Sequence, residues 1–195
     1  WDKEQFVLTQ FLLVDRDCEP HMLEAVAEEM CNFSILVTFN GKSFDVPLLK
    51  NRFIMNELIN RFSEPTHHID LYSLVRKLGK HPVFGLSLKE SMKRFVGVSR
   101  QNDIPGHIIP ALYFMYEQDN DVSVLEPVLE HNRIDISDMG SLLHILTLVF
   151  AGEHMLYRDA SALAGVGKYL LHKGDLGLAK QIFALSLRPH LDPYY

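Results

Sequence analysis

The sequence of 195 residues has only two cysteines, Cys18 and Cys31, and one tryptophan. Two cysteines form neither a disulfide framework nor a zinc site, so the sequence is typical of a protein from the reducing cytoplasm. Cys31 ends an apolar helical pattern, and we expect it to lie in the core. The sequence also opens without a signal peptide and begins at Trp1 rather than at methionine, so we expect a fragment of a longer chain.

Long apolar runs and several common motifs are also missing. The longest apolar run, Leu142–Ala151, is interrupted by His144 and Thr147. It is far shorter than the about 20 residues that cross a bilayer, so we expect no membrane partner. The sequence has no P-loop, GxGxxG, CxxC or GxSxG motif. It therefore lacks the signatures of nucleotide cradles, redox dithiols and α/β-hydrolase nucleophiles.

Neither an extreme charge nor a low hydrophobicity marks the composition. Hydrophobic residues make up 47% and charged residues 23%, which is typical of globular proteins and argues against disorder. The net charge of −6 is unevenly spread: residues 1–41 hold 2 basic and 8 acidic side chains, residues 42–100 hold 11 and 5, and residues 101–195 hold 6 and 12. The basic middle part is compatible with a face that follows phosphates, or with a solvated surface that has no partner.

Strand and helix patterns alternate in the first part of the chain. β-Branched, aromatic and apolar runs predict one strand or two short ones at Gln5–Val14, and buried strands at Ile35–Phe39 and His68–Leu71. Apolar residues at helical spacing predict helices at Pro20–Phe33, Val46–Ile59, residues 71–78 and Ser87–Val96.

From about residue 108 onward every pattern is helical. The predicted helices are Ile108–Tyr116, Val122–Glu130, Asn132–Phe150, Ala160–His172 and Leu176–Leu187. Strands that alternate with helices, followed by helices alone, predict an α/β fold with an all-α C-terminal part.

One candidate site lies where a strand end, a polar loop and a helix start meet, at Phe39–Leu49. Such strand ends are where α/β folds place their sites, so Asp45 is a candidate metal ligand and Lys42 a candidate phosphate contact. The alternatives are that Asp45, two residues before Pro47, caps the helix and that Lys42 is only solvated.

A second candidate is the pair His131 and Asp135. Residues at i and i+4 are about 40° apart around a helix and share a face. If Asp135 binds a metal ion, His131 can take a proton from an attacking water. The alternative is a helix start at which His131 or Asn132 is the cap and Asp135 interacts with the positive end of the helix.

A third candidate is the loop Gly97–Gly106, which contains Arg100, Asp103 and a proline. We expect Arg100 and Asp103 to hold this loop together. The alternative is that Arg100 contacts a phosphate.

These three segments together resemble a known family. Asn40-x3-Phe44-Asp45-x-Pro47 resembles the second exonuclease motif of the ribonuclease H-like 3′–5′ exonucleases, with the spacing of family B polymerase proofreading domains. His131-x3-Asp135 resembles their third motif. With Arg100-x2-Asp103-Ile-Pro-Gly106 added, the order is similar to that of the YprB-type ribonuclease H-like domain, over about residues 5–150.

The resemblance implies a mixed sheet flanked by helices at residues 1–151 and a metal-dependent nuclease activity. It implies a 3′–5′ exonuclease that acts on a single-stranded end of DNA or RNA with two ions, Mg²⁺ or Mn²⁺, held by carboxylates. The implied ligands are Asp45 and Asp135, and His131 orients or deprotonates the attacking water. In the resemblance Asn40 and Phe44 shape the site. Together with Lys42 and Arg100 they are the candidate substrate contacts.

Two features depart from the family. Three residues separate His131 from Asp135, which is the spacing of the tyrosine type rather than of the histidine type. The family also opens with a strand that carries Asp-x-Glu. Asp2 and Glu4 have that spacing but precede the first apolar strand. We therefore expect the Asp-x-Glu strand upstream of Trp1, and two of the four acids to be missing from this chain.

The C-terminal residues 152–195 have a likeness of their own. Gly167, Gly174-Asp175, Ala179 and Leu187 fall near tetratricopeptide positions. We expect a helical hairpin that packs on the nuclease-like domain or begins a longer array, and that offers a surface to a protein partner. An ordinary αα-hairpin is the alternative. The competing function is a catalytically inactive ribonuclease H-like module that binds nucleic acid or protein.

Overall fold

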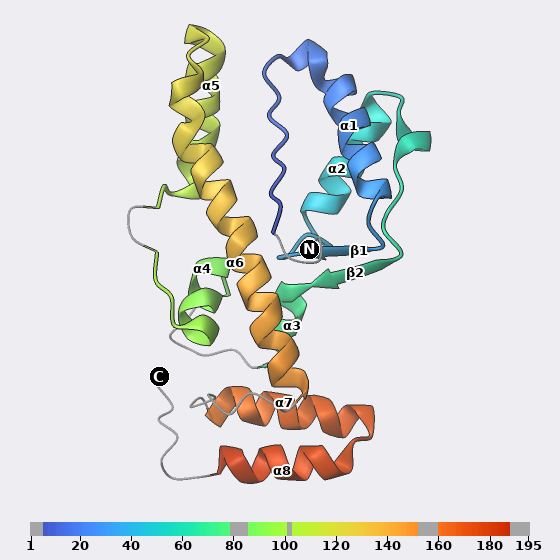
Figure 1. Ribbon diagram of the computed structural model, residues 1–195, viewed down its shortest axis with the longest axis vertical. Coiled ribbons are helices and arrows are strands. Elements are labelled where there is room, and N and C mark those ends of the chain that lie inside the picture. The colour runs from blue at the N-terminus through green and yellow to red at the C-terminus, as the bar shows by residue number, and fades with distance from the viewer. Residues whose placement is uncertain (1–5, 79–85, 101–102, 152–159, 188–195) are drawn as a thin grey trace. The chain divides into compact units, whose positions relative to one another are not determined.

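The computed structural model describes residues 6–78, 86–100, 103–151 and 160–187 (Figure 1). The chain forms two compact units. Unit 1 comprises residues 1–69 and 101–137, and unit 2 comprises residues 70–100 and 138–195. The sequence predicted a different division, between a family domain at residues 1–151 and a helical extension at residues 152–195. That division stays a prediction.

The described part of unit 1 contains a small sheet and four α-helices, two of which follow the sheet only after residues 70–100 of unit 2. Its elements are α1 (Glu19–Cys31), β1 (Ile35–Thr38), α2 (Asp45–Met55), β2 (His67–Asp70), α5 (Ile109–Asp119) and the beginning of α6 (Glu126–Ala151). Short 3₁₀ turns precede several of them, at Arg16–Cys18, Ile59–Arg61, Gly106–Ile108 and Val122–Leu125. Apart from α6, the α-helices and strands of unit 1 lie within a few residues of their predicted positions.

The sheet pairs β1 with β2 in parallel, as the arrows in Figure 1 show. The N–H of His67 donates to the carbonyl of Ser34 at 2.9 Å, and Thr38 Oγ1 is hydrogen-bonded to His68 Nε2 at 2.8 Å. Both strands were expected to be buried, but Ile35 is 51% exposed. The α/β fold with an all-α C-terminal region is confirmed.

The strand predicted at Gln5–Val14 is not formed by residues 6–14, and Gln5 lies outside the described residues. A β-favourable sequence forms a strand only where a neighbouring backbone completes the ladder. Here side chains take up the polar groups instead. The hydroxyls of Tyr113 and Tyr116 donate to the carbonyls of Leu13 and Val14, at 2.9 and 2.8 Å.

The core of unit 1 lies between α1 and α2. Leu23, Ala27 and Phe53 are buried. Leu49, Leu58 and Phe62 pack against them, and the rings of Phe53 and Phe62 are 5.2 Å apart. Cys31, which we expected in this core, is exposed, because it is the last residue of α1.

Helix α6 is one continuous helix, so the prediction of separate helices at Val122–Glu130 and Asn132–Phe150 is wrong. Neither glycine nor proline interrupts the sequence between Val128 and Met139, and Pro127 fits in the first turn. By length and composition alone, Val122–Ala151 is long and apolar enough to cross a membrane. Leu142, Leu146 and Val149 of this helix are buried, but only 17% of its apolar window is buried inside the described structure.

Unit 2 is helical. It contains α3 (Leu71–Lys77), α4 (Leu88–Ser91), a π-helical turn (Met92–Val96), the end of α6, α7 (Ala160–Lys173) and α8 (Leu176–Ser186). Ser87 and Glu90 form a capping box that starts α4. Helices α7 and α8 form the predicted hairpin. Gly167 lets them approach closely, because a Cβ there would lie 2.8 Å from the ring of Phe183.

Candidate functional site

The loop between β1 and α2 brings Asp45 to the start of a helix. Asn40 adopts a left-handed conformation with φ 65°, which asparagine tolerates well. At Gly41 a side chain would collide with Thr38, whose Cβ would lie 2.5 Å from the added Cβ. The N–H of Val46 donates to the carbonyl of Gly41 at 2.9 Å, which ties the loop to the helix. The strand end, the turn and the helix start are thus locally fixed.

Asp45 is the first residue of α2 and is exposed. The alternative that Asp45 caps this helix is wrong: the N-cap residue is Phe44, and no side chain makes a capping hydrogen bond there. A carboxylate in the first turn is stabilised by the positive end of the helix. The aromatic ring of Phe44 is 63% exposed beside it.

His131 connects two carboxylates. Its Nδ1 lies 2.6 Å from Oδ1 of Asp103, and its Nε2 lies 3.5 Å from Oδ2 of Asp135. The exposed fraction of the side chain rises along this series, from 7% for Asp103 through 19% for His131 to 34% for Asp135. The prediction that His131 and Asp135 share a helix face is therefore confirmed. The Nε2 edge of the His131 ring faces Asp135, the most exposed of the three side chains.

His131 is not at a helix start. Helix α6 begins at Glu126, so the alternative that His131 or Asn132 caps it is wrong. The side chain of Asn132 has another partner, because its Oδ1 accepts from Gln10 Nε2 at 2.9 Å. Gln10 also donates to the carbonyl of Leu129 at 3.0 Å. The extended segment of residues 6–14 thus contacts the helix on both sides of His131 in the sequence.

Arg100 and Asp103 each bind a residue of α6. Arg100 Nε and Nη2 lie 2.7 and 2.6 Å from Oδ2 of Asp138, within unit 2, and only 6% of the Arg100 side chain is exposed. Asp103 binds His131 within unit 1. These salt bridges tie the loop to the helix at two positions, and the expectation that Arg100 and Asp103 hold the loop together stays a prediction. A contact of Arg100 with a phosphate stays a prediction.

The two residues that the family would use to bind a metal ion have suitable ligand atoms. Asp45 and Asp135 offer carboxylate oxygens, the donors that Mg²⁺ and Mn²⁺ prefer. Within the described ranges, no group of three or more His, Cys, Asp and Glu residues is arranged to hold a metal ion. The predicted convergence of Asp45 and Asp135, and the contacts of Asn40 and Lys42 with a substrate, stay predictions.

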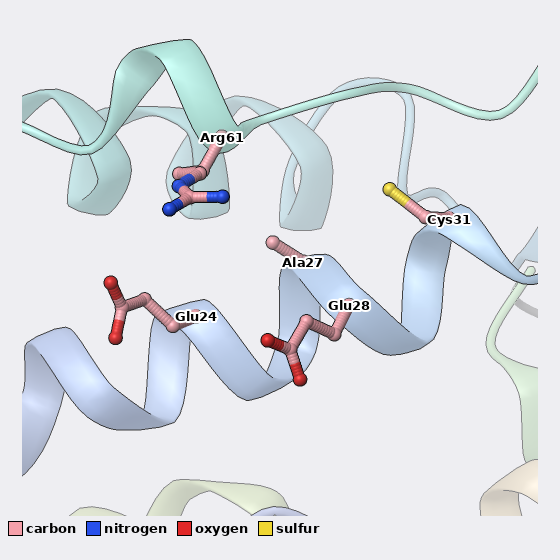
Figure 2. Close-up of a pocket in the computed structure, with 5 residues that line it drawn as sticks. All are labelled: Glu24, Ala27, Glu28, Cys31 and Arg61. Carbon is pink, nitrogen blue, oxygen red and sulfur yellow. The ribbon is translucent and has the colours of Figure 1, made fainter.

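Unit 1 also has a pocket of about 330 Å³ that the sequence did not indicate (Figure 2). Its lining residues are Glu24, Ala27, Glu28, Cys31 and Arg61. Figure 2 shows the Glu24 carboxylate and the Arg61 guanidinium on opposite walls. No residue predicted for the catalytic site lines this pocket.

Comparison with known families identifies the family of this chain. Residues 1–147 match the model of the RNase H superfamily. The chain belongs to the RNase H superfamily. The match includes the loop of Asp45, the loop of Asp103 and the part of α6 that carries His131 and Asp135. It confirms the resemblance drawn from the three sequence motifs.

A curated relative of this RNase H-like domain is the uncharacterized protein YprB of Bacillus subtilis (strain 168). The two chains are 29% identical over 182 residues, which is 92% of this chain and 44% of YprB. The chain therefore spans less than half the length of this relative. No solved structure matches the chain.

Membership of the RNase H superfamily implies an RNase H-like domain of the kind found in nucleases. Nucleases of this superfamily generally use divalent metals such as Mg²⁺. A divalent ion in such a site supplies positive charge that stabilises the transition state and lowers the pKa of a water molecule.

Proposed function

We propose that the protein is a metal-dependent nuclease, a 3′–5′ exonuclease that hydrolyses DNA or RNA by a two-metal mechanism. The observation that carries the proposal is His131, which binds Asp103 through one ring nitrogen and faces Asp135 with the other, on a helix inside an RNase H-like domain. A histidine in this setting is suited to orienting an attacking water and taking its proton.

The other residues have separate roles in this proposal. Asp45 and Asp135 hold Mg²⁺ or Mn²⁺ through their carboxylate oxygens. The exposed ring of Phe44 stacks on a base, and Lys42 contacts a phosphate. Asn40, which precedes both residues in the loop after β1, also contacts the substrate. Arg100 is the most buried of the four proposed substrate contacts and is already bound to Asp138.

The test is a nuclease assay on the full-length protein that contains this domain. Single-stranded DNA and RNA labelled at the 5′ end are incubated with Mn²⁺, Mg²⁺ or EDTA, and a substrate with a blocked 3′ end is run in parallel. We expect metal-dependent shortening from the 3′ end that the block prevents. Asp45→Asn and Asp135→Asn should abolish it, whereas Asp119→Asn, an exposed residue at the end of α5, should not. Metal-independent cleavage, or none, contradicts the proposal.

A second candidate is a catalytically inactive RNase H-like module that binds nucleic acid or protein in the cytoplasm. It would apply if the Asp-x-Glu strand were truly absent, because the protein would then carry only two of the four acids of the family. In this case the tetratricopeptide-like hairpin of α7 and α8 contacts a protein partner. Binding of a single-stranded oligonucleotide without cleavage, in the presence of Mn²⁺, distinguishes this candidate from the nuclease.

A further inference from the structure

Asp103 has the geometry of a residue that acts through His131. The two side chains come from parts of the chain 28 residues apart, and their contact is the shorter of the two that His131 makes, 2.6 Å against 3.5 Å. The Asp103 side chain is 7% exposed. A carboxylate that is so far removed from water needs a hydrogen-bonded partner, and His131 provides one.

The short contact with an ionised Asp103 favours a proton on Nδ1 of His131, the ring nitrogen that faces it. An ionised carboxylate only accepts hydrogen bonds, so His131 Nδ1–H must be the donor to Asp103 Oδ1. In a neutral imidazole the proton on Nδ1 leaves Nε2 without one. Nε2 is the nitrogen that faces Asp135, whose side chain is 34% exposed. The nitrogen able to accept a proton therefore lies on the side of the ring nearer to the solvent.

We propose that Asp103 is a positioning residue for His131: its carboxylate holds the Nδ1 proton and thereby directs the unprotonated Nε2 towards Asp135 and the attacking water. This inference rests on the proposed nuclease function for its catalytic consequence, but the hydrogen bond and the position of the proton do not depend on it. Helix α6 fixes the backbone of His131, and Asp103 fixes the rotation and the tautomer of its ring.

Nitrogen-15 spectroscopy of the His131 ring tests the position of the proton directly. The spectrum is recorded on the full-length protein without metal, at one fixed pH at which the ring is neutral, and His131→Gln assigns the signals. We expect the proton on Nδ1 in the unchanged protein. In Asp103→Asn we expect it to be shared between Nδ1 and Nε2, because the asparagine side chain can both accept and donate. A proton on Nε2 in the unchanged protein overturns the proposal, whether or not the protein is a nuclease.

Steady-state kinetics tests the consequence for the reaction. Asp103→Asn should lower kcat by about 10- to 100-fold, part of the effect of a general base, and change KM less than twofold. Asp103→Glu keeps the charge and should recover part of the loss. Asp119→Asn, which removes an exposed aspartate of unit 1, should leave kcat unchanged.

The outcomes separate this inference from the proposed function. An unchanged protein without nuclease activity rejects the function, and the ring spectrum then decides the inference alone. An active Asp103→Asn protein with kcat equal to that of Asp119→Asn overturns the inference and leaves the function standing. If Asp103→Asn and Asp103→Glu both lose their cooperative thermal unfolding, Asp103 has a structural role and the proposal is wrong.

Discussion

Gly41 lies so close to Thr38 that an added Cβ would be 2.5 Å from the Thr38 Cβ. Thr38 is held in place, because its Oγ1 is hydrogen-bonded to His68 Nε2 of the neighbouring strand at 2.8 Å. The sharp turn after β1 therefore depends on the absence of a side chain at residue 41. The same turn leads to Asp45, so the position of that carboxylate depends on it too.

Gly41→Ala should destabilise the protein by about 1–3 kcal/mol, because the added methyl group forces either Thr38 or the turn to move. Chemical denaturation followed by circular dichroism measures the change. Gly106→Ala is the matched control, since nothing lies within 4 Å of a Cβ at that position. Equal stability of the two variants would contradict the close approach at Gly41.

The salt bridge between Glu19 and Arg52 should make stability depend on pH. Hydrogen bonds from Arg52 lower the pKa of Glu19 from 4.5, with a smaller contribution from Asn56. A lowered pKa in the folded state stabilises the protein above pH 4.5, and this contribution is lost as the pH falls through the pKa of the folded state. Glu19→Gln should cost about 0.5–1 kcal/mol at pH 7, since Arg52 is 40% exposed.

Denaturation at pH 7 and at pH 3 measures this effect, with Glu28→Gln on the exposed side of the same helix as the control. The difference between Glu19→Gln and the unchanged protein should shrink at pH 3. A difference that stays constant between the two pH values would mean that the ionised Glu19 carboxylate is not what stabilises the fold.

His131→Ala should lower the turnover rate more than the affinity for metal. His131 contacts Asp135 at 3.5 Å but contributes no carboxylate oxygen, so its loss removes a proton acceptor rather than a ligand. Turnover and Mn²⁺ binding are measured on the same full-length variant. The exposed His107, replaced by alanine, is the control. If the turnover rate of His131→Ala equals that of the unchanged protein, His131 has only a structural role in α6.

Asp45 and Asp135 should converge to within about 8 Å, a separation that one or two divalent ions can bridge. A crystal structure of the full-length protein with Mn²⁺ measures the distance and locates the ions by their anomalous scattering. Carboxylates on opposite sides of unit 1 would remove the metal site from the proposal.

A strand that carries Asp-x-Glu should complete both the sheet and the site. The described sheet has two strands, and residues 6–14 do not form a strand in it. Each buried backbone group left unpaired costs about 1–3 kcal/mol, against a typical domain stability of 5–15 kcal/mol. We therefore expect this chain alone to show little activity, and an N-terminally extended chain to show metal-dependent activity on single-stranded DNA or RNA.

Both chains are assayed with Mn²⁺ under the same conditions. Equal, metal-dependent activity in both would contradict the need for the additional strand. Activity in neither would favour the binding module over the nuclease.

Local patterns predicted most of the elements. The strands β1 and β2 and the hairpin of α7 and α8 lie where apolar runs and the Gly174-Asp175 turn placed them, because their signals are short-range. Asp175 caps α8 by accepting a hydrogen bond from the N–H of Leu178 at 3.1 Å. The strand at Gln5–Val14 was predicted wrongly because a strand depends on a neighbour that the local sequence does not specify.

The candidate site was predictable only in part. The spacing of His131 and Asp135 indicated a shared helix face, since both are on one helix. The contact of His131 with Asp103 had no local signal, because the two residues are 28 positions apart and belong to different elements. The salt bridge of Arg100 with Asp138 likewise had no local signal, because the two residues are 38 positions apart.

The hydrogen bonds of Tyr113 and Tyr116 have a consequence for the order in which the chain folds. They join α5 to the carbonyls of Leu13 and Val14 across 100 and 102 residues of sequence. During synthesis on the ribosome the N-terminal segment emerges long before its tyrosine partners do. Unit 1 therefore cannot close until residues 101–137 have left the exit tunnel, by which time all of residues 70–100 of unit 2 are already outside. Contacts across such long sequence separations slow folding, so the apolar segment of residues 6–14 is exposed to chaperones during this interval.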